Sequence, residues 1–462
     1  DRFALVASCA GLVRNHFTLP RQIVRFYVRL NEALRPPEPS LEAMRQDELA
    51  AHFRELERRL LLRWDAPLVN DFFAMIFYGV LRKLTAKWCD DSDGTLQNNL
   101  LCGEGGMISA EPAKRVRELA ALAAGDAAGV ATLCGGSRRA IESWLQSAPE
   151  FRSRYEAYLE KFGDRCLEEL KLESLTLHDE PLTLLRSVGH FARRLGARGM
   201  TEEGLDATLR AQAEARVAQA LTGRPLRRLV FAWALKHTRA RVRDRENLRF
   251  ERTRLFGRVR RIYVELGKRF RAMGKFAEPR EVFYLTVEEV LGFVEGTTAT
   301  TDLAGMAVLR EREFARFRAK PAPADRFATR GAVHLGNRFQ AEKPAVVPSG
   351  NSLRGTGCCP GVVRGRARVV LDPHDAKIEP GEILVAPRTD PGWIMLFPSA
   401  AGLLVEHGSL LSHSAIVARE MGIPAIVAVA GVTAWVQTGE WLEIDGSTGV
   451  VHKIAEQTIR TS

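Results

Sequence analysis

Residues 406–425 read EHGSLLSHSAIVAREMGIPA, and this stretch tells more about the fold than any other part of the chain. Ser412 is a residue type that favours the N-cap position, and residues 414–421 are good helix formers. Gly422 suits the C′ position that follows a helix, where a left-handed backbone conformation is common. The stretch therefore predicts a short helix with His413 at its first turn.

His413 would lie where backbone N–H groups have no partner inside the helix. A phosphate on its imidazole would meet those donors and the positive end of the helix dipole, a gain of about 0.3–1 kcal/mol, or ~2 kcal/mol when partly buried. The same field disfavours a protonated ring and keeps the imidazole neutral, as a nucleophile requires. Arg419 is close enough in sequence to reach a neighbouring phosphate, although helix geometry does not require it. The alternative is a structural histidine at a helix start.

Segments typical of strands surround this helix. Polar and apolar residues are interleaved from Val362 to Leu371, as in a half-buried strand. The runs 383–386 and 402–405 are continuously apolar, as in buried strands. Turn signals occur at residues 390–392 and 445–446. The pattern predicts a small α/β unit in the C-terminal part of the chain.

The same region resembles the phosphohistidine swivelling domain, which is the mobile domain of phosphoenolpyruvate-utilising enzymes. The resemblance covers residues 354–454 and rests on motifs in the family's order: Cys359–Val363, Gly365–Val370, Gly381–Ala386, Thr389–Trp393, residues 406–425 and Gly439–Val451. It implies that His413 accepts a phosphoryl group at one active site and carries it to another. Ser412 and Arg419 are further candidate catalytic residues in this segment.

Two details of the resemblance concern the surroundings of the histidine. Thr389 and Asp390 belong to the loop that the resemblance places beside it, so they are candidate substrate-binding residues. The family usually has Gly-Gly before the active segment, whereas this chain has His407 and Gly408. His407 either adds a second imidazole near the phosphate or is a loop histidine with no special role.

Residues 1–317 follow a helical pattern almost throughout. Apolar residues recur at helical spacing, for example Leu41, Met44, Leu49, Phe53, Leu56 and Leu60. The composition of residues 318–353 is typical of a linker, either a hinge for a moving domain or an ordinary interdomain connection. We therefore predict a multidomain protein with a large all-α N-terminal region followed by a small α/β (β/β/α) swivelling domain. Residues 455–462 would form a C-terminal tail.

The helical region carries a second, weaker resemblance, to the acceptor domain of rifampicin-phosphotransferase-like proteins. It rests on segments that also occur in the family's order: Asn70–Phe72, Gly103-Glu104, Ser109–Pro112, Tyr158–Arg165, Glu168–Leu172, Asp179–Pro181, Leu266–Arg269 and Pro279–Thr286. The resemblance implies that residues 1–317 bind the acceptor of the phosphoryl group. Asp164 stands where the family usually has histidine, so the acid–base role of that histidine does not transfer.

Asp164, Arg165, Glu168 and Glu169 form a compact charged group in the sequence. A carboxylate there can accept the proton of an acceptor hydroxyl or amide, and Arg165 can hold the transferring phosphoryl group. Asp164, Arg165 and Glu169 are therefore candidate catalytic residues, and Glu168 is a candidate substrate-binding residue. The alternative is a salt-bridge cluster that fixes a helix turn.

A second basic group recurs at helical spacing and consists of Arg241, Arg245, Arg249 and Arg252. Like charges at such spacing repel one another by a few tenths of a kcal/mol per pair. A bound anion would offset the repulsion, but so would the neighbouring acidic residues Asp244, Glu246 and Glu251. We therefore interpret this group as a solvated basic helix face.

Composition and charge indicate a globular protein with an anionic ligand. The 462 residues carry a net charge of +11, and 46% of them are hydrophobic, as in a soluble globular protein. Acidic residues outnumber basic ones in 354–454, so the positive charge belongs to the helical region and suits an anionic substrate. Nucleic-acid binding is not expected, because no helix-turn-helix, zinc finger or basic stripe interleaved with aromatic residues is found.

The sequence shows no signal for a membrane or for a bound metal. No apolar run of about 18 residues and no secretory signal is found, so no membrane partner is expected. The seven cysteines are scattered without metal-ligand spacing, which is typical of reduced thiols. We expect a cytoplasmic protein that holds no metal of its own.

Missing segments narrow the expected reaction. We find no phosphate-binding loop and no stretch that resembles an ATP-grasp domain, and the chain begins at Asp1 rather than Met. It also lacks the C-terminal barrel that binds pyruvate in the dikinase and synthase, so pyruvate is not the expected acceptor. We expect an ATP-grasp domain or partner to bind ATP and Mg²⁺, and His413 to pass a phosphoryl group to a small-molecule hydroxyl or amide. The alternatives are a protein acceptor and a non-catalytic scaffold.

Overall fold

The computed structural model describes residues 2–91, 94–101, 106–108, 111–198, 205–320, 327–328, 340–341, 350–373, 378–410 and 412–455. The chain forms two compact units. The first unit contains residues 1–35, 58–257 and 350–462, and the second contains residues 36–57 and 258–349. The long helix α11 (Pro225–Ala272) contributes residues to both units.

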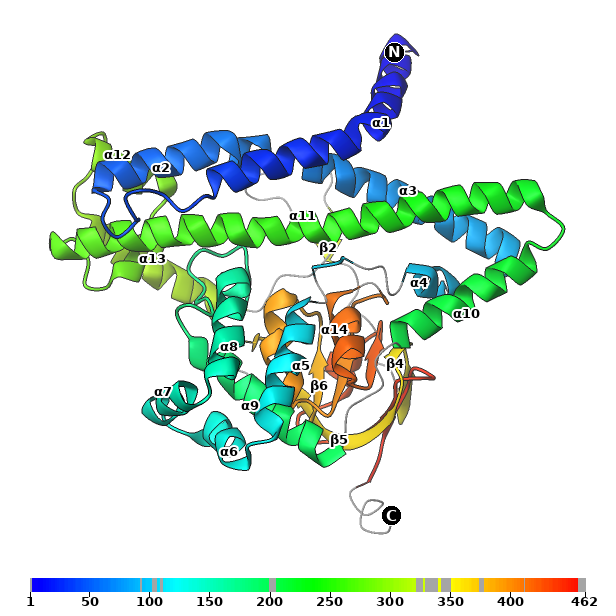
Figure 1. The fold of residues 1–462 in the computed structure, drawn as a ribbon. Helices are drawn as coiled ribbons and strands as arrows, with labels where there is room; N and C mark the ends of the chain where they lie inside the picture. Colours follow the sequence, from blue (N-terminus) through cyan, green and yellow to red (C-terminus); the bar gives the residue numbers. More distant parts are fainter. Residues whose placement is uncertain are drawn as a thin grey trace. The chain divides into compact units, whose positions relative to one another are not determined.

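Helices make up most of residues 1–257 in the first unit (Figure 1). They are α1 (Arg2–Ala33), η1 (Leu61–Arg63), α3 (Asp65–Cys89), α4 (Thr95–Leu101), α5 (Glu111–Ala124), α6 (Ala127–Gly135), α7 (Arg138–Ser147), α8 (Pro149–Phe162), α9 (Pro181–Arg198), α10 (Leu205–Ala220) and the N-terminal part of α11. Local sequence explains several boundaries. The carboxylate of Asp126 accepts the N–H of Gly129 at the start of α6 (2.8 Å), and Asp90 ends α3 in the left-handed conformation (φ 51°).

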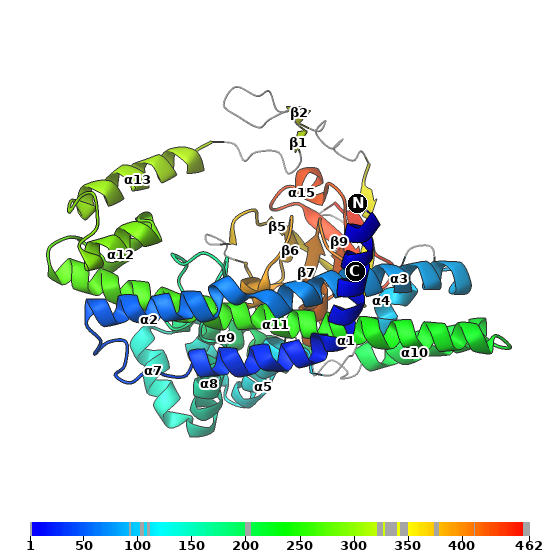
Figure 2. The same ribbon diagram turned by 90° about the horizontal axis from the view of Figure 1, so that it is seen from above.

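Three helices of the first unit lie alongside one another. The first-unit part of α11 runs beside α1 and α3 in both views (Figures 1 and 2). The ring of His16 on α1 lies 5.6 Å from Phe73 of α3 and 4.8 Å from His237 of α11, measured between ring centroids. This packing places α3 and α11 together as a continuous helical surface.

The second unit contains α2 (Gln46–Arg59) and the C-terminal part of α11, followed by η2 (Pro279–Tyr284), α12 (Val287–Glu295) and α13 (Leu303–Arg318). The predicted helical spacing is confirmed on α2, where Leu49, Phe53 and Leu56 are buried. A reciprocal pair of hydrogen bonds between Thr286 and Glu289 starts α12.

The predicted linker lies between α13 and the sheet. Strands β1 (Phe327–Ala328) and β2 (Gln340–Ala341) pair antiparallel. The rest of the predicted linker from residue 321 to residue 349 lies outside the described residues, as do residues 456–462 of the predicted tail.

The C-terminal part of the first unit is an α/β domain, residues 352–453. Its strands are β3 (Ser352–Arg354), β4 (Thr356–Cys359), β5 (Val362–Val369), β6 (Ile383–Ala386), β7 (Gly402–Val405), β8 (Ala425–Val427), β9 (Trp441–Asp445) and β10 (Val450–Lys453). They form one sheet in the order β3-β10-β9-β5-β6-β7-β8-β4. The pairs β5–β6, β6–β7 and β7–β8 are parallel, and the outer pairs are antiparallel. Strands β3 and β4 are the two edge strands of this sheet, yet only Gly355 separates them in the sequence. The two edges therefore lie close together, and the sheet is curled.

The predicted fold class is confirmed: a large helical N-terminal region precedes a mixed α/β domain. Both faces of the central strands are buried, which explains their continuous apolar sequence. Leu384 and Leu403 join a core with helices α5 and α9, whereas Val385 and Leu404 point into the interior of the curled sheet. Among the described residues, no helix has the length and apolar character needed to cross a membrane.

Candidate functional site

The short helix predicted after Ser412 is present as α14 (His413–Met421), and His413 is its first residue. Gly422 ends the helix in the left-handed conformation (φ 61°), and its N–H donates to the carbonyls of Ala418 and Arg419. Ser412 has the backbone conformation of an N-cap, but its hydroxyl makes no capping hydrogen bond. It donates instead to the carbonyl of Ser409 (2.7 Å). Ser412 is thus the N-cap residue, as predicted, and its side chain fixes the turn before the helix.

The His413 imidazole is held neutral. Its Nε2 atom is buried and has no hydrogen-bond partner. Burial, followed by the nearby charge of Arg165, lowers the pKa of His413 from 6.5 to about 3. At neutral pH the ring therefore keeps a free lone pair. A buried polar atom without a partner needs an explanation, and a ligand in the adjoining cavity would supply one.

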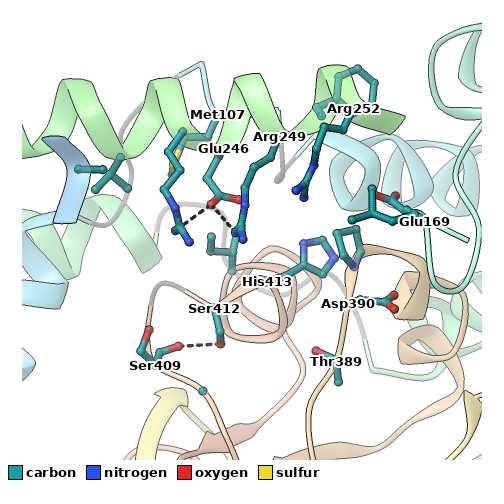
Figure 3. A pocket seen from close by; sticks show the side chains of 18 of the residues that line it. Met107, Glu169, Glu246, Arg249, Arg252, Thr389, Asp390, Ser409, Ser412 and His413 are labelled. Carbon is teal, nitrogen blue, oxygen red and sulfur yellow. Dashed lines mark hydrogen bonds and ion pairs between the residues drawn. The ribbon is translucent and has the colours of Figure 1, made fainter. Parts of the chain in front are cut away.

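His413 opens onto a cavity of about 960 Å³ in the first unit, between α14 and the helical region (Figure 3). Its apolar lining comes from α3, α11, α14 and two loops: Ala74, Met75, Tyr78, Met107, Leu170, Val242, Phe250 and Ile416. Its charged lining consists of Arg165, Glu168, Glu169, Lys171, Arg245, Glu246, Arg249, Arg252 and Asp390. A cavity of this size, with an apolar lining and convergent polar groups, has the properties of a small-molecule site.

Arg249 and Arg252 of α11 lie across the cavity from His413 (Figure 3), and Arg245 of the same helix also lines the cavity. We call these three residues the arginine wall. Glu246 is shared between two of them, at 3.5 Å from Arg245 and 3.6 Å from Arg249. The Nε atom of Arg252 is buried without a hydrogen-bond partner, and burial lowers the pKa of this guanidinium. The interpretation as a solvated basic face therefore does not describe Arg252, whereas the side chains of Arg245 and Arg249 are 36% and 45% exposed. The fourth, Arg241, is buried and paired with Asp244 at 2.9 Å.

Arg165 reaches the cavity from the turn after α8. Its side chain is only 5% exposed and pairs with Glu169 at 3.0 Å. The other oxygen of Glu169 accepts the hydroxyl of Thr253 at 2.8 Å. The guanidinium also lies over the ring of Phe250, at 5.3 Å from its centroid. Arg165 is thus both a member of a salt-bridge cluster and part of the cavity lining, and Glu169 orients it.

The other charged candidates near Arg165 have different surroundings. Asp164 does not line the cavity, and its carboxyl packs against Gly257 on α11. Glu168 lines the rim and pairs with Lys171 at 2.6 Å. The structure brings Arg165, Glu168 and Glu169 to the cavity and leaves Asp164 outside it.

The loop expected beside the histidine does lie there. Thr389 and Asp390 both line the cavity, and the hydroxyl oxygen of Thr389 is buried without a partner. Asp390 accepts the N–H of Gly392 (2.8 Å) and that of Glu168 (3.3 Å). Burial raises the pKa of Asp390. The loop therefore touches both the cavity and the helical region.

Two sequence candidates lie away from the cavity. His407 is exposed, with Nε2 at 3.8 Å from Glu406, and does not line it. Arg419 is 7% exposed and donates to the carbonyl of Leu410 at 3.1 Å. In this arrangement Arg419 supports the loop before α14 and does not face a phosphate on His413.

In the part of the chain that it describes, the structure assigns no function to the cysteines or to a metal site. Among the described residues, no three His, Cys, Asp or Glu side chains are grouped so as to hold a metal ion. Cys358 and Cys359 are both buried, and the thiol of Cys358 donates to the carbonyl of Ala425 at 3.3 Å. Gly103, Glu104 and Ser109, which belong to the second resemblance, lie outside the described residues.

Comparison with known families identifies both parts of the site. Residues 378–449 match the model of the PEP-utilising enzyme mobile domain, and residues 67–246 match the rifampicin phosphotransferase fourth domain. The first match contains His413 and the second contains Arg165 and Arg245. The chain thus joins a PEP-utilising enzyme mobile domain to a rifampicin phosphotransferase fourth domain.

Individual relatives agree with this assignment. The chain is 30% identical over 306 residues to rifampicin phosphotransferase of Streptomyces sviceus, a match that covers 65% of this chain and 34% of that protein. It is 29% identical to rifampicin phosphotransferase of Bacillus subtilis, over 64% of this chain and 33% of the relative. An uncharacterized protein of Mycobacterium tuberculosis is 30% identical over 75% of this chain and 36% of its own length. The chain thus spans about a third of the length of these relatives.

Proposed function

We propose that this chain is the carrier and acceptor-binding part of a phosphotransferase that works through phosphohistidine. His413 accepts a phosphoryl group from ATP and passes it to the hydroxyl or amide of a small molecule bound in the cavity. ATP and Mg²⁺ bind to an ATP-grasp domain or partner. The observation that carries the proposal is the neutral, unpartnered Nε2 of His413 at a cavity lined by Arg165 and the arginine wall.

The chemistry takes place in two half-reactions. In the first, the imidazole lone pair attacks phosphorus of the donor, an N–P bond forms and the P–O bond to the leaving group breaks. In the second, an acceptor oxygen or nitrogen attacks the same phosphorus, and the electron pair of the broken N–P bond returns to the imidazole. The acceptor's proton passes to a carboxylate of the cavity, for which Glu169 and Glu246 are the candidates.

Cations around the phosphoryl group supply most of the catalysis in this mechanism. Its oxygens carry the charge of the transition state, and guanidinium groups in a partly dry site stabilise that charge. Arg252 fits this role because its buried Nε has no other partner. Removing one such donor typically lowers the rate about 10²–10³-fold.

The cavity supports a small-molecule acceptor over a protein acceptor. Its volume of about 960 Å³ lies at the upper end of the usual range for small ligands, roughly 300–1,000 Å³. The apolar lining from α3 and α11 offers a surface for the non-reacting part of such a molecule. Use of ATP as the donor is the reason to expect the reaction in the cytoplasm.

The proposal is tested by phosphoryl labelling of the longest native form of the protein, or of this chain with lysate of its source. ATP labelled separately at the β and γ positions is the probe, and His413→Ala is the matched variant. Acid-labile, alkali-stable label from the β-phosphate, absent from the variant, is expected for a donor reaction in which AMP leaves the β-phosphorus and water removes the γ-phosphate as inorganic phosphate. Label from the γ-phosphate alone would keep the carrier and reject that donor reaction. Equal or absent label in both proteins would leave the scaffold alternative.

A further inference from the structure

A turn of the α/β domain rests directly on the backbone of the helical region. Gly392, in η4 (Pro391–Met395), has no room for a side chain. A Cβ atom there would lie 2.2 Å from the carbonyl oxygen of Cys166 and 2.8 Å from the amide nitrogen of Leu167. Beside it, Asp390 accepts the N–H of Glu168 at 3.3 Å. We call residues 390–392 and 166–168 the two sides of the docking contact.

The rest of this seam is mainly apolar. Helix α5 packs against α14, and α9 packs against η4 and η5 (Phe397–Ser399). Val116 and Leu119 of α5, Val188 of α9 and Ala415 of α14 belong to one buried core. Apolar packing stabilises such a seam without specifying direction, because its energy follows the buried area. Close contacts to backbone atoms, in contrast, allow only one position of the α/β domain on the helical region.

The helical side of the docking contact is a preformed surface. Cys166 pairs with Thr176 in an isolated β-bridge. The N–H of Leu177 donates to the carbonyl of Arg165 at 3.1 Å, so the loop is closed by its own backbone bonds. Glu168 adopts a left-handed conformation (φ 55°), which is uncommon for a residue other than glycine. A backbone held in this way cannot easily move aside for a new side chain.

We propose that Gly392 and Asp390 are positioning residues that dock the α/β domain on residues 166–168 and thereby direct His413 to the acceptor cavity. Gly392 permits the approach, and the Asp390 carboxylate fixes its orientation. The inference rests on the proposed function, because it assigns the acceptor-facing step to this contact. A side chain at position 392 abolishes docking but leaves loading of His413 by the donor intact.

The first test uses the full chain without any donor. Hydrogen–deuterium exchange is followed at the amides of residues 163–172 in wild type and in Gly392→Ala. Loss of docking frees the N–H of Glu168, so exchange in this segment is expected to rise about tenfold or more. Gly125→Ala is the matched control, because a Cβ at Gly125 meets no atom within 4 Å. Asp390→Ala removes the acceptor without adding bulk and should produce a smaller rise.

Folding of the variants is checked independently. The three atoms nearest to the new Cβ all belong to Cys166 and Leu167, so Gly392→Ala should leave the α/β domain itself folded. Exchange at the β6 and β7 amides should therefore equal that of wild type. Unchanged exchange at residues 163–172 in Gly392→Ala would overturn the docking proposal. A general rise that includes β6 and β7 would overturn it as well, because it would mean that Gly392 is needed for the fold.

The second test separates the two half-reactions. Gly392→Ala should acquire phosphoryl label on His413 as wild type does, but transfer of that label to an acceptor should fall about 100-fold or more. Equal loss of loading and transfer would contradict a docking role. If wild type itself takes no label, the proposed function fails, while the exchange measurement still decides whether the docking contact exists.

Discussion

The two walls of the cavity are encoded in different ways. The α/β wall comes from two short segments, residues 389–391 and 408–416, which lie close together in the sequence. The helical wall combines α3, Met107, the turn at residues 165–171 and α11. The place of His413 at the start of α14 follows from the local sequence, whereas its low pKa follows from burial and from the charge of Arg165. The helical wall exists only after four segments that are distant in the sequence have packed, so no local pattern reveals it.

The largest loss of phosphoryl transfer should come from a substitution in the helical wall. Arg252→Gln is expected to lower phosphoryl transfer from His413 to an acceptor by roughly 10²-fold, because the guanidinium no longer stabilises the transferring group. Stability should stay unchanged or rise slightly. Burial already lowers the pKa of Arg252, which means that its charge is unfavourable there without an anion. Single-turnover transfer from labelled protein and urea unfolding measure the two quantities.

Arg228→Gln is the control for this prediction. Arg228 lies on the same helix, is exposed and does not line the cavity. It should transfer at the wild-type rate. Equal losses in both variants would mean that the general charge of α11 matters, and not the position of Arg252.

Much of the fold could be predicted from the sequence. The strands at 383–386 and 402–405 are apolar because both of their faces are buried, and α14 is delimited by Ser412 and Gly422. These features follow from local rules of burial and capping. These rules do not specify the partner of the Ser412 hydroxyl, which donates to the carbonyl of Ser409.

The surroundings of the arginine wall could not be predicted from the sequence. Helical spacing correctly placed Arg245, Arg249 and Arg252 on one side of α11, but spacing does not say what that side meets. Arg241 has the same spacing and is buried against Asp244 instead. The one usable signal was the repulsion among like charges, which a bound anion would relieve. Nearby carboxylates gave an equally good explanation, and Glu246 does pair with both Arg245 and Arg249.

A change of pH should have an intermediate effect, which is on the free energy of unfolding. The pKa of His413 is about 3 in the folded protein and 6.5 in the unfolded chain, so between these values only the unfolded chain binds the proton. The contribution of His413 to the free energy of unfolding is complete above pH 6.5 and decreases as the pH falls toward 3. The slope is about 1.4 kcal/mol per pH unit, or roughly 2 kcal/mol between pH 6.5 and 5.

His413→Gln isolates this contribution, because glutamine stays neutral over the whole range. Urea unfolding of both proteins at pH 7 and pH 5 should show that wild type loses about 2 kcal/mol more than the variant. Parallel losses would mean that His413 is protonated in the folded protein at pH 5, and the neutral nucleophile would then lose its support at that pH.

The smallest loss of phosphoryl transfer should come from a substitution of Asp164, which is adjacent to Arg165 in the sequence. Asp164 and Arg165 belong to one charged group, but only Arg165 lines the cavity. Asp164→Asn keeps the shape that packs against Gly257, so transfer from phosphohistidine should stay within about threefold of wild type, or ~0.7 kcal/mol. Glu169→Gln weakens the partner that orients Arg165 and should cost more. A loss of 100-fold in Asp164→Asn would show that this carboxylate reaches the acceptor in a conformation other than the one described, and would restore the acid–base role that its place in the sequence suggests.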